Sequence, residues 1–205
     1  MFLEQIAVGP MQNFSYLVGD DQTKEAFVVD PGFDHHKILQ RAKAHQANIT
    51  RIFLTHTHSD HINAVAPLKA ATGAMVVAHQ LVQSMGIIAI DEGVEDGASF
   101  ILGKKVVKIL HTPGHTPEGI CLLVNDQWLI TGDTLFIGNC GRADLPSSSI
   151  KGLFSSLQRL KLLPGALIVC PGHDYGPRAT QTLDEERRTN PTLLAQSVEE
   201  FCLIP

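Results

Sequence analysis

The feature that most constrains the fold occurs in both halves of the chain: a short apolar run ends in a turn that carries histidine. In the first half, the apolar run at 51–55 is followed directly by HTHSDH at 56–61. In the second half, the runs at 106–110 and 166–170 precede turns that carry further histidines. Short apolar runs bounded by turn residues are typical of buried strands, and α/β sheets commonly build their sites at strand ends. The pattern predicts buried strands with a polar site along one edge.

Apolar periodicity predicts that strands and helices alternate along the chain without an interrupting linker. The predicted strands are 14–19, 26–30, 51–55, 106–110, 119–124, 127–131 and 166–170, and the predicted helices are 34–46, 64–72, 150–162, 178–188 and 193–201. We expect Asn63 to cap the second helix and Asn125-Asp126 to form a hairpin turn. These elements predict two β-sheets packed together with helices outside, in a single domain of residues 1–205.

Composition narrows the class of protein. A chain of 205 residues with 44% hydrophobic residues is long enough for one large buried core. The net charge of −5 and the absence of a basic run argue against a nucleic-acid partner. No apolar run approaches the roughly 18 residues that a membrane-spanning helix needs. The first residues do not resemble an export signal, so we expect a cytoplasmic protein that binds a small molecule, and self-association is compatible with this reading.

The HTHSDH segment is the strongest chemical signal, with three imidazoles and one carboxylate in six residues. Histidine and aspartate are common ligands of zinc, iron and manganese. His56 and His58 can point at one ion, while Asp60 and His61, one turn later, point at a neighbouring ion. The alternative reading of this segment is a polar turn with exposed histidines.

Three further residues have similar settings. His115 and His173 lie in glycine-containing turns after predicted strands, and Asp133 follows a glycine. Each of them alone is more typical of a surface turn or a core position. Together with HTHSDH they supply seven ligands, enough for two ions with a shared carboxylate. We expect the remaining histidines to have no such role: His111 is read as structural, and His35, His36, His45 and His79 as exposed helix residues.

The order HxHxDH, histidine, aspartate, histidine resembles the metallo-β-lactamase superfamily from VVDPG at 28–32 to His173. The resemblance implies an α/β fold, an αββα sandwich of two mixed β-sheets flanked by helices. It also implies a role for each matching residue: His56, His58 and His115 bind the first metal, Asp60, His61 and His173 the second, Asp133 bridges them, and Asp30 braces the histidine loop. An aspartate rather than a cysteine at the bridging position argues against a secreted antibiotic-degrading enzyme.

Within that superfamily, GDTLFIGNCGRADLP at 132–146 and PGHDYG at 171–176 resemble two branches. One is the hydroxyacylglutathione hydrolase (glyoxalase II) group, whose full-length members carry a C-terminal helical domain that we expect this shorter chain to lack. The other is the persulfide dioxygenase group. Arg142 matches a basic position that contacts glutathione in the hydrolase, and we expect Tyr175 to join it in binding substrate.

The two branches imply different chemistry on the same residues. The hydrolase uses two divalent ions, zinc ahead of iron or manganese, and a metal-bound hydroxide that cleaves an acyl-glutathione-like thioester, with Asp60 orienting the hydroxide. The dioxygenase uses one Fe(II) on His56, His115 and Asp133 and oxidises glutathione persulfide. Because all seven ligands are intact, the hydrolase is the preferred reading. A non-catalytic metal module is disfavoured, since the cysteine-rich clusters typical of such modules do not occur.

Overall fold

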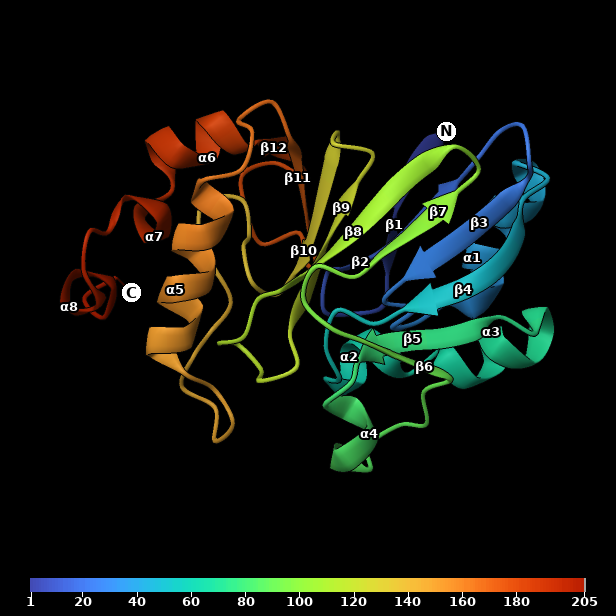
Figure 1. Cartoon of the computed structure of the whole chain (residues 1–205), viewed down its shortest axis with the longest axis horizontal. Helices are drawn as coiled ribbons and strands as arrows, with labels where there is room; N and C mark the ends of the chain where they lie inside the picture. Colours follow the sequence, from blue (N-terminus) through green and yellow to red (C-terminus); the bar gives the residue numbers. More distant parts are fainter. Residues whose placement is uncertain (205) are drawn as a thin grey trace.

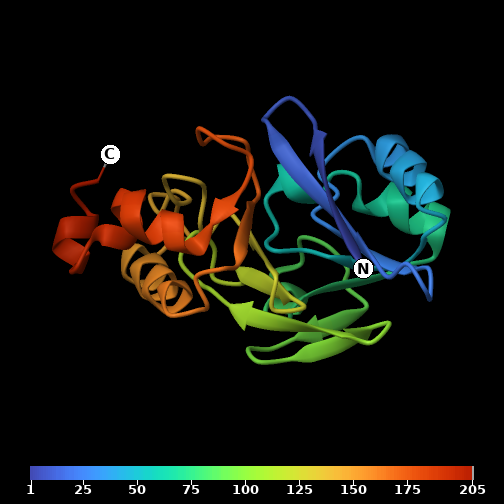
Figure 2. The same ribbon diagram turned by 90° about the horizontal axis from the view of Figure 1, so that it is seen from above.

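Two six-stranded β-sheets pack face to face in the computed structural model, which describes residues 1–204 (Figures 1 and 2). The first sheet has the order β1-β2-β3-β4-β5-β6, with β1 (Phe2–Val8), β2 (Asn13–Gly19), β3 (Glu25–Val29), β4 (Asn48–Phe53), β5 (Met75–His79) and β6 (Glu92–Val94). The second has the order β12-β11-β10-β9-β8-β7, with β7 (Ser99–Leu102), β8 (Lys105–His111), β9 (Ile120–Val124), β10 (Trp128–Gly132), β11 (Ile168–Pro171) and β12 (Gln181–Thr182).

Both sheets are mixed. In the first, β1, β2 and β3 pair antiparallel, and β3 to β6 pair parallel. In the second, β10 and β11 pair parallel and the other neighbours pair antiparallel. The hairpin between β9 and β10 turns at Asn125 and Asp126, which both have positive φ, as the turn types favoured in tight hairpins require. The predicted turn is confirmed.

Helices cover the two outer faces. They are α1 (His35–Ala44), α2 (Ser59–Ile62), α3 (Val65–Thr72), α4 (Val82–Met85), α5 (Ile150–Lys161), α6 (Leu183–Thr189), α7 (Pro191–Leu194) and α8 (Val198–Phe201). In Figure 1, α1 and α3 lie outside the first sheet, and α5 to α8, orange to red, lie beyond the second. The predicted αββα sandwich is therefore confirmed. Among residues 1–204, no helix combines the length and the apolar character that crossing a membrane requires.

Alternation along the strands builds three apolar layers. On β2, Leu17 packs in the cluster under α1 and α3, whereas Tyr16 and Val18 face the second sheet. On β9, Leu122 packs between the sheets and Leu123 belongs to the cluster beneath α5 to α8. Successive strand residues point to opposite faces, so a strand covered on both faces is mostly apolar rather than alternating. This explains why the short apolar runs marked the strands.

Several predicted boundaries were wrong. Ala64, not Asn63, precedes α3, because Asn63 ends α2. The helix predicted at 178–188 begins only at Leu183, because residues 181–182 pair with β11 as β12. The helix predicted at 193–201 is divided into α7 and α8.

His79 corrects a further expectation. It ends β5 rather than lying on an exposed helix, and it is buried with its ring stacked on that of His111. The parallel strands β4 and β6 pair with β5 on either side, which places this histidine inside the sheet.

Candidate metal centre

The seven predicted ligands meet at one place because the segments that carry them end at the same edge of the two sheets. The segments are the loop after β4, α2, the loop between β8 and β9, and the ends of β10 and β11, and they carry in that order His56 and His58, Asp60 and His61, His115, Asp133, and His173. The first two of these segments follow β4 of the first sheet and the other three follow strands of the second, so the centre lies across the join between the sheets.

Local backbone geometry aims these side chains. His58 has extended backbone angles and leads into the single turn of α2, and the amide of His61 donates to the carbonyl of His58. Asp133 is preceded by Gly132 at φ +47, where a Cβ would come within 2.3 Å of the Thr55 hydroxyl. Any larger residue at 132 would therefore meet both strain and a clash. The turn that presents Asp133 requires this glycine.

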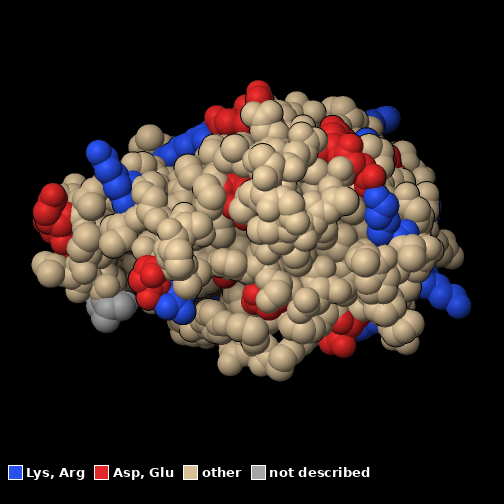
Figure 3. Space-filling model, turned by 90° about the horizontal axis from the view of Figure 1, so that it is seen from below, with Lys and Arg blue, Asp and Glu red and all other residues tan. Residues whose placement is uncertain are grey.

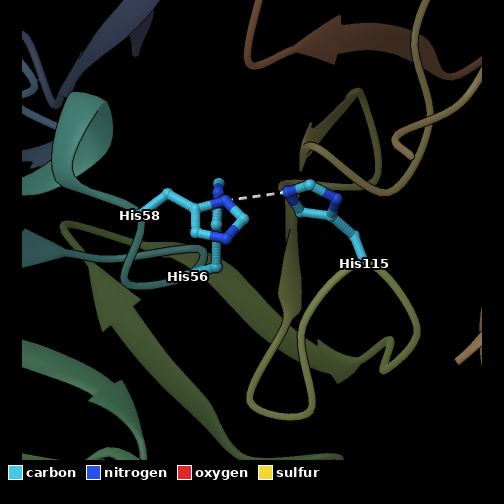
Figure 4. A group of neighbouring side chains, drawn as sticks. All are labelled: His56, His58 and His115. Carbon is cyan, nitrogen blue, oxygen red and sulfur yellow. Dashed lines mark hydrogen bonds between the residues drawn. The ribbon is translucent and has the colours of Figure 1, made fainter. Parts of the chain in front are cut away.

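The first group consists of His56, His58 and His115, whose possible ligand atoms all lie within 4.8 Å of one another. Figure 4 shows the three rings converging, His56 and His58 from the loop after β4 and His115 from the loop between β8 and β9. The dashed line joins Nδ1 of His58 to Nε2 of His115 at 3.0 Å. Three imidazole nitrogens at this spacing can hold one transition-metal ion.

The second group consists of Asp60, His61 and His173, which meet the same distance criterion. The Nε2 atoms of the two histidines are 3.1 Å apart. Oδ2 of Asp60 lies 3.6 Å from Nε2 of His61 and 3.4 Å from Nε2 of His173. The amide of Asn13 donates to that same oxygen at 2.9 Å and holds the carboxylate in place.

Asp133 lies between the two groups. Its Oδ2 is 3.6 Å from Nε2 of His115 and 3.3 Å from Nε2 of His173, and its Oδ1 is 3.4 Å from Nε2 of His61. The side chain is 10% exposed, so these nitrogens rather than bulk water surround the carboxylate. The structure thus brings Asp133 into reach of both groups.

Hydrogen bonds on the far side of the rings determine where the histidines carry their protons. Nδ1 of His173 faces the carbonyl of Met11 at 2.9 Å, and Nδ1 of His115 faces the carbonyl of Arg142 at 2.8 Å. Nδ1 of His61 faces a carboxylate oxygen of Asp30 at 3.0 Å. Carbonyl and carboxylate oxygens only accept, so each Nδ1 carries a hydrogen and each neutral ring presents the Nε2 lone pair to the site.

The directions of these lone pairs show whether the residues are suited to binding a metal ion. Nε2 of His61 and Nε2 of His173 lie 3.1 Å apart, so the contact is favourable only when a proton or a metal ion is bound between them. Nε2 of His56 and Oδ1 of Asp133 are buried and have no hydrogen-bond partner among residues 1–204. Buried polar atoms without a partner are rare in folded proteins. Inward lone pairs, unpartnered atoms and an anionic centre fit metal ions.

The pKa values of the ionisable groups also indicate a site that attracts cations. Burial opposes protonation of His61, but Asp133 and the hydrogen bond to Asp30 outweigh it and raise the pKa of His61 to about 9. Burial would raise the pKa of Asp133, yet the positive charge on His61 and the hydrogen bond from His173 hold it well below its usual range. Burial lowers the pKa of His56 and His58. The centre therefore contains an ionised carboxylate that attracts cations, either protons or metal ions.

Asp30, to which the resemblance assigns the bracing of the histidine loop, contacts that loop through its carboxylate. Its carboxylate accepts from the amide of Thr55 at 2.7 Å, from the hydroxyl of Thr55 at 2.6 Å and from His61. Its ligand atoms also lie close to those of His56 and His61. Because both of its oxygens are already engaged in these bonds, we assign it to positioning rather than to metal binding.

Glu118 is a positioning residue that sequence reasoning missed. Its Oε1 accepts from the amide of Thr57 at 3.1 Å and from the hydroxyl of Thr57 at 2.7 Å, so it holds the residue between His56 and His58. The side chain is buried at 1% exposure. Since 61 residues separate it from Thr57, no local pattern could have revealed the contact.

A cavity of about 640 Å³ opens beside both groups, and Arg142 and Tyr175 line it as expected. The ring of Tyr175 stacks on that of His173 with centroids 4.5 Å apart. The guanidinium of Arg142 is exposed and donates to both carboxylate oxygens of Asp144, at 2.6 and 2.7 Å. Substrate binding by these two residues stays a prediction, and an anion that binds Arg142 must compete with Asp144.

Comparison with known proteins identifies relatives of both branches. Residues 8–173 match the sequence model of the metallo-β-lactamase superfamily. A hydroxyacylglutathione hydrolase of Polaromonas sp. is 38% identical over 181 residues, which cover 85% of this chain and 67% of that protein. The mitochondrial persulfide dioxygenase ETHE1 of Mus musculus is 34% identical over 192 residues, which cover 92% of this chain and 74% of that protein. The crystal structure of ETHE1 from Myxococcus xanthus superposes with a TM-score of 0.89 at 33% identity, covering 100% of this chain and 92% of the other.

Proposed function

The chain belongs to the metallo-β-lactamase superfamily, and from its site we propose that it is a metal-dependent hydrolase that cleaves thioesters. The position of Asp133 carries the proposal. Its carboxylate oxygens lie within 3.6 Å of histidine nitrogens from both ligand groups. A carboxylate shared between two sets of ligands is suited to a centre of two ions, which in hydrolytic enzymes lie roughly 3.5–4 Å apart.

We expect two divalent ions, zinc ahead of iron or manganese, because imidazole and carboxylate donors suit these metals. The first group would hold one ion and the second group the other, with Asp133 between them. When bound, such ions would lower the pKa of a bound water to about 7 and would polarise a carbonyl oxygen of the substrate.

The protein's own residues would then orient the reactants. Asp60 is held by Asn13 and lines the cavity, so it can accept a proton from the attacking water. The water oxygen bonds to the carbonyl carbon, the carbon–sulfur bond breaks, and the proton passes to the leaving thiolate. The products are a carboxylic acid and a thiol. Because thiol pKa values are near 8.5, the thiolate leaves without a separate acid.

Acyl-glutathione is the first substrate to test, since the branch that the chain resembles implies it. Arg142 and Tyr175 lie at the cavity, where they can contact the thiol half of such a molecule. A small-molecule thioester fits a cavity of about 640 Å³, which lies within the usual size range of ligand pockets.

A persulfide dioxygenase is the second candidate, and the full-length match to ETHE1 from Myxococcus xanthus favours it. In this case His56, His115 and Asp133 would hold one Fe(II), as two histidines and a carboxylate do in non-haem iron oxygenases. Oδ2 of Asp133 lies 4.0 Å from Nε2 of His56 and 3.6 Å from Nε2 of His115. The remaining four ligands would surround this ion without binding it.

Metal analysis of protein purified without added metal, combined with two activity assays, distinguishes the candidates. We expect two ions per chain and hydrolysis of S-lactoylglutathione, without oxygen uptake when glutathione persulfide is added. One iron per chain with oxygen uptake and no hydrolysis would refute the hydrolase and support the dioxygenase.

His173→Ala sharpens the same test. In the hydrolase this variant should retain about one ion and less than about a hundredth of the parent's thioester cleavage, because a whole coordination bond is lost. In the dioxygenase the iron should stay, and oxygen uptake should fall by about 10–100-fold at most. His36→Ala is the matched control, since His36 is exposed on α1 away from the ligand groups.

A further inference from the structure

A second cavity of about 400 Å³ lies between the loop 139–144, the first turns of α5 and the end of α8. Its wall is mainly apolar, with Ile150 and Leu153 from α5 on one side and Phe201 and Ile204 on the other. Leu153 and Phe201 belong to the core cluster beneath the C-terminal helices. The cavity is thus an opening in the packing between α5 and α8.

This cavity and the cavity beside the ligand groups share the chain segment 139–142. The segment lies directly against the centre: a Cβ on Gly141 would come within 1.9 Å of the backbone oxygen of Asp133. The side-chain amide of Asn190 donates to the carbonyl of Asn139 at 3.0 Å and to that of Phe136 at 3.2 Å. Because Asn190 is buried, these bonds hold the shared segment in place. A single fixed loop therefore borders both cavities.

The charged residues that line the two cavities indicate which class of ligand the second cavity can bind. Among the residues that line the two cavities, Arg142 is the one lysine or arginine, and Asp144 neutralises it through two hydrogen bonds. In Figure 3, the face seen from below is mostly uncharged, and its blue and red atoms form small separate groups. The second cavity therefore offers apolar contact and no free positive charge for a phosphate or carboxylate.

We propose that the second cavity binds the apolar arm of the acyl group. The substrates are then thioesters whose acyl groups are uncharged and of medium chain length. The inference rests on the proposed thioester hydrolysis. It assigns the acyl half rather than the thiol half to this cavity, because the thiol halves of biological thioesters carry amides and charges that an apolar wall does not satisfy. The reacting carbonyl lies at the metal centre, and the acyl arm extends along 139–142.

The test is a series of acetyl, butyryl, hexanoyl and octanoyl thioesters of N-acetylcysteamine with the metal-loaded protein. Each buried methylene group contributes enough transfer free energy to change binding by about fourfold. We expect kcat/KM to rise by about that factor per methylene until the cavity is filled.

Ile150→Glu places a carboxylate at the cavity wall and should remove the chain-length dependence while the acetyl rate stays at the parent level. Ile150 is 41% exposed at the first position of α5, where an acidic residue is favoured, so the variant should fold. Ile101→Glu is the matched control, because Ile101 is 58% exposed on the edge strand β7.

Failure of the inference and failure of the proposed function give different results. Hydrolysis of the acetyl thioester with no rise along the series, or with the same rise in Ile150→Glu, would overturn the acyl cavity alone. No hydrolysis of any thioester would overturn the proposed function. Calorimetric binding of S-octyl-N-acetylcysteamine, a thioether that cannot be hydrolysed, then tests the cavity without activity: we expect at least tenfold weaker binding to Ile150→Glu, and equal binding would overturn the cavity assignment.

Discussion

Replacing Asp30 with asparagine should weaken one metal site far more than the other. In the parent, Oδ1 of Asp30 accepts from the amide of Thr55 at 2.7 Å, and Oδ2 accepts from the hydroxyl of Thr55 at 2.6 Å and from Nδ1 of His61 at 3.0 Å. An asparagine oxygen in the Oδ1 position keeps the first bond. The new amino group then faces two donors at the other position, so His61 keeps its contact only if Nδ1 becomes the acceptor. Its Nε2 then carries the hydrogen and no longer binds a metal.

The size of the effect follows from these contacts. Losing the partner that orients a ligating histidine typically reduces metal affinity by about 10–100-fold, which corresponds to about 1.4–2.7 kcal/mol. The first group should change less, because Asp30 reaches His56 only through the Thr55 hydroxyl, 3.0 Å from Nδ1 of His56. The metal-free protein should also lose about 1.5–3 kcal/mol of unfolding free energy with the charge-assisted hydrogen bonds.

Zinc titration of the metal-free protein against a chromophoric chelator measures both affinities, and chemical denaturation measures the unfolding free energy. Asp126→Asn is the control, since Asp126 is exposed in the hairpin turn. Two unchanged zinc affinities in Asp30→Asn, or an equal loss at both sites, would refute the argument that Asp30 sets the proton position on His61.

Three further predictions concern the same centre. His58→Ala and Asp133→Ala should each abolish thioester hydrolysis with an unchanged circular dichroism spectrum, and wild-type rates in either would eliminate the two-ion mechanism. Arg142→Ala should raise KM for an anionic thioester by about tenfold through loss of a charge-assisted hydrogen bond, whereas Asp144→Ala, which frees the guanidinium, should lower KM; a neutral thioester should respond to neither. Because His61 must release its proton to bind a metal and its pKa is raised from 6.5 to about 9, zinc affinity of the second group should rise with pH and level off above about 9. Isothermal titration at a series of pH values measures this affinity. A zinc affinity that does not change between pH 6.5 and pH 9 would contradict the prediction.

The sandwich and the HTHSDH segment were predictable from short-range patterns, whereas the resemblance to the superfamily was needed to assign His115, Asp133 and His173 to the same candidate site. A strand covered on both faces is mostly apolar, as β9 is throughout and β10 is apart from Thr131 and Gly132, so such strands stand out as runs. Few residue types bind transition metals, so few functions other than metal binding explain HTHSDH directly after a strand. The partners of those ligands were not predictable, because Glu118 and Asn13 reach the site through long-range contacts that leave no local signal.

Errors at the C-terminal helices have a local cause that the sequence did contain. The hydroxyl of Ser197 accepts from the amide of Glu200 and starts α8 as a new helix. Serine followed three residues later by glutamate is a recognised helix-start signal, which here outweighs the continuous apolar spacing of 193–201. His79 differs, because only its place between two parallel neighbours determines that the strand is buried.

The placement of the ligands across the join between the sheets has a consequence for folding. Asp60 and His61 come from the first half of the chain and His173 from near its end, so an ion bound to them closes a loop of more than half the protein. Such a cross-link forms only after both sheets have docked, and it then opposes their separation. Metal binding should therefore convert two sheets that open independently into one cooperative unit. Amide hydrogen exchange would show this as similar protection in β4 and β11 with zinc and different protection without it.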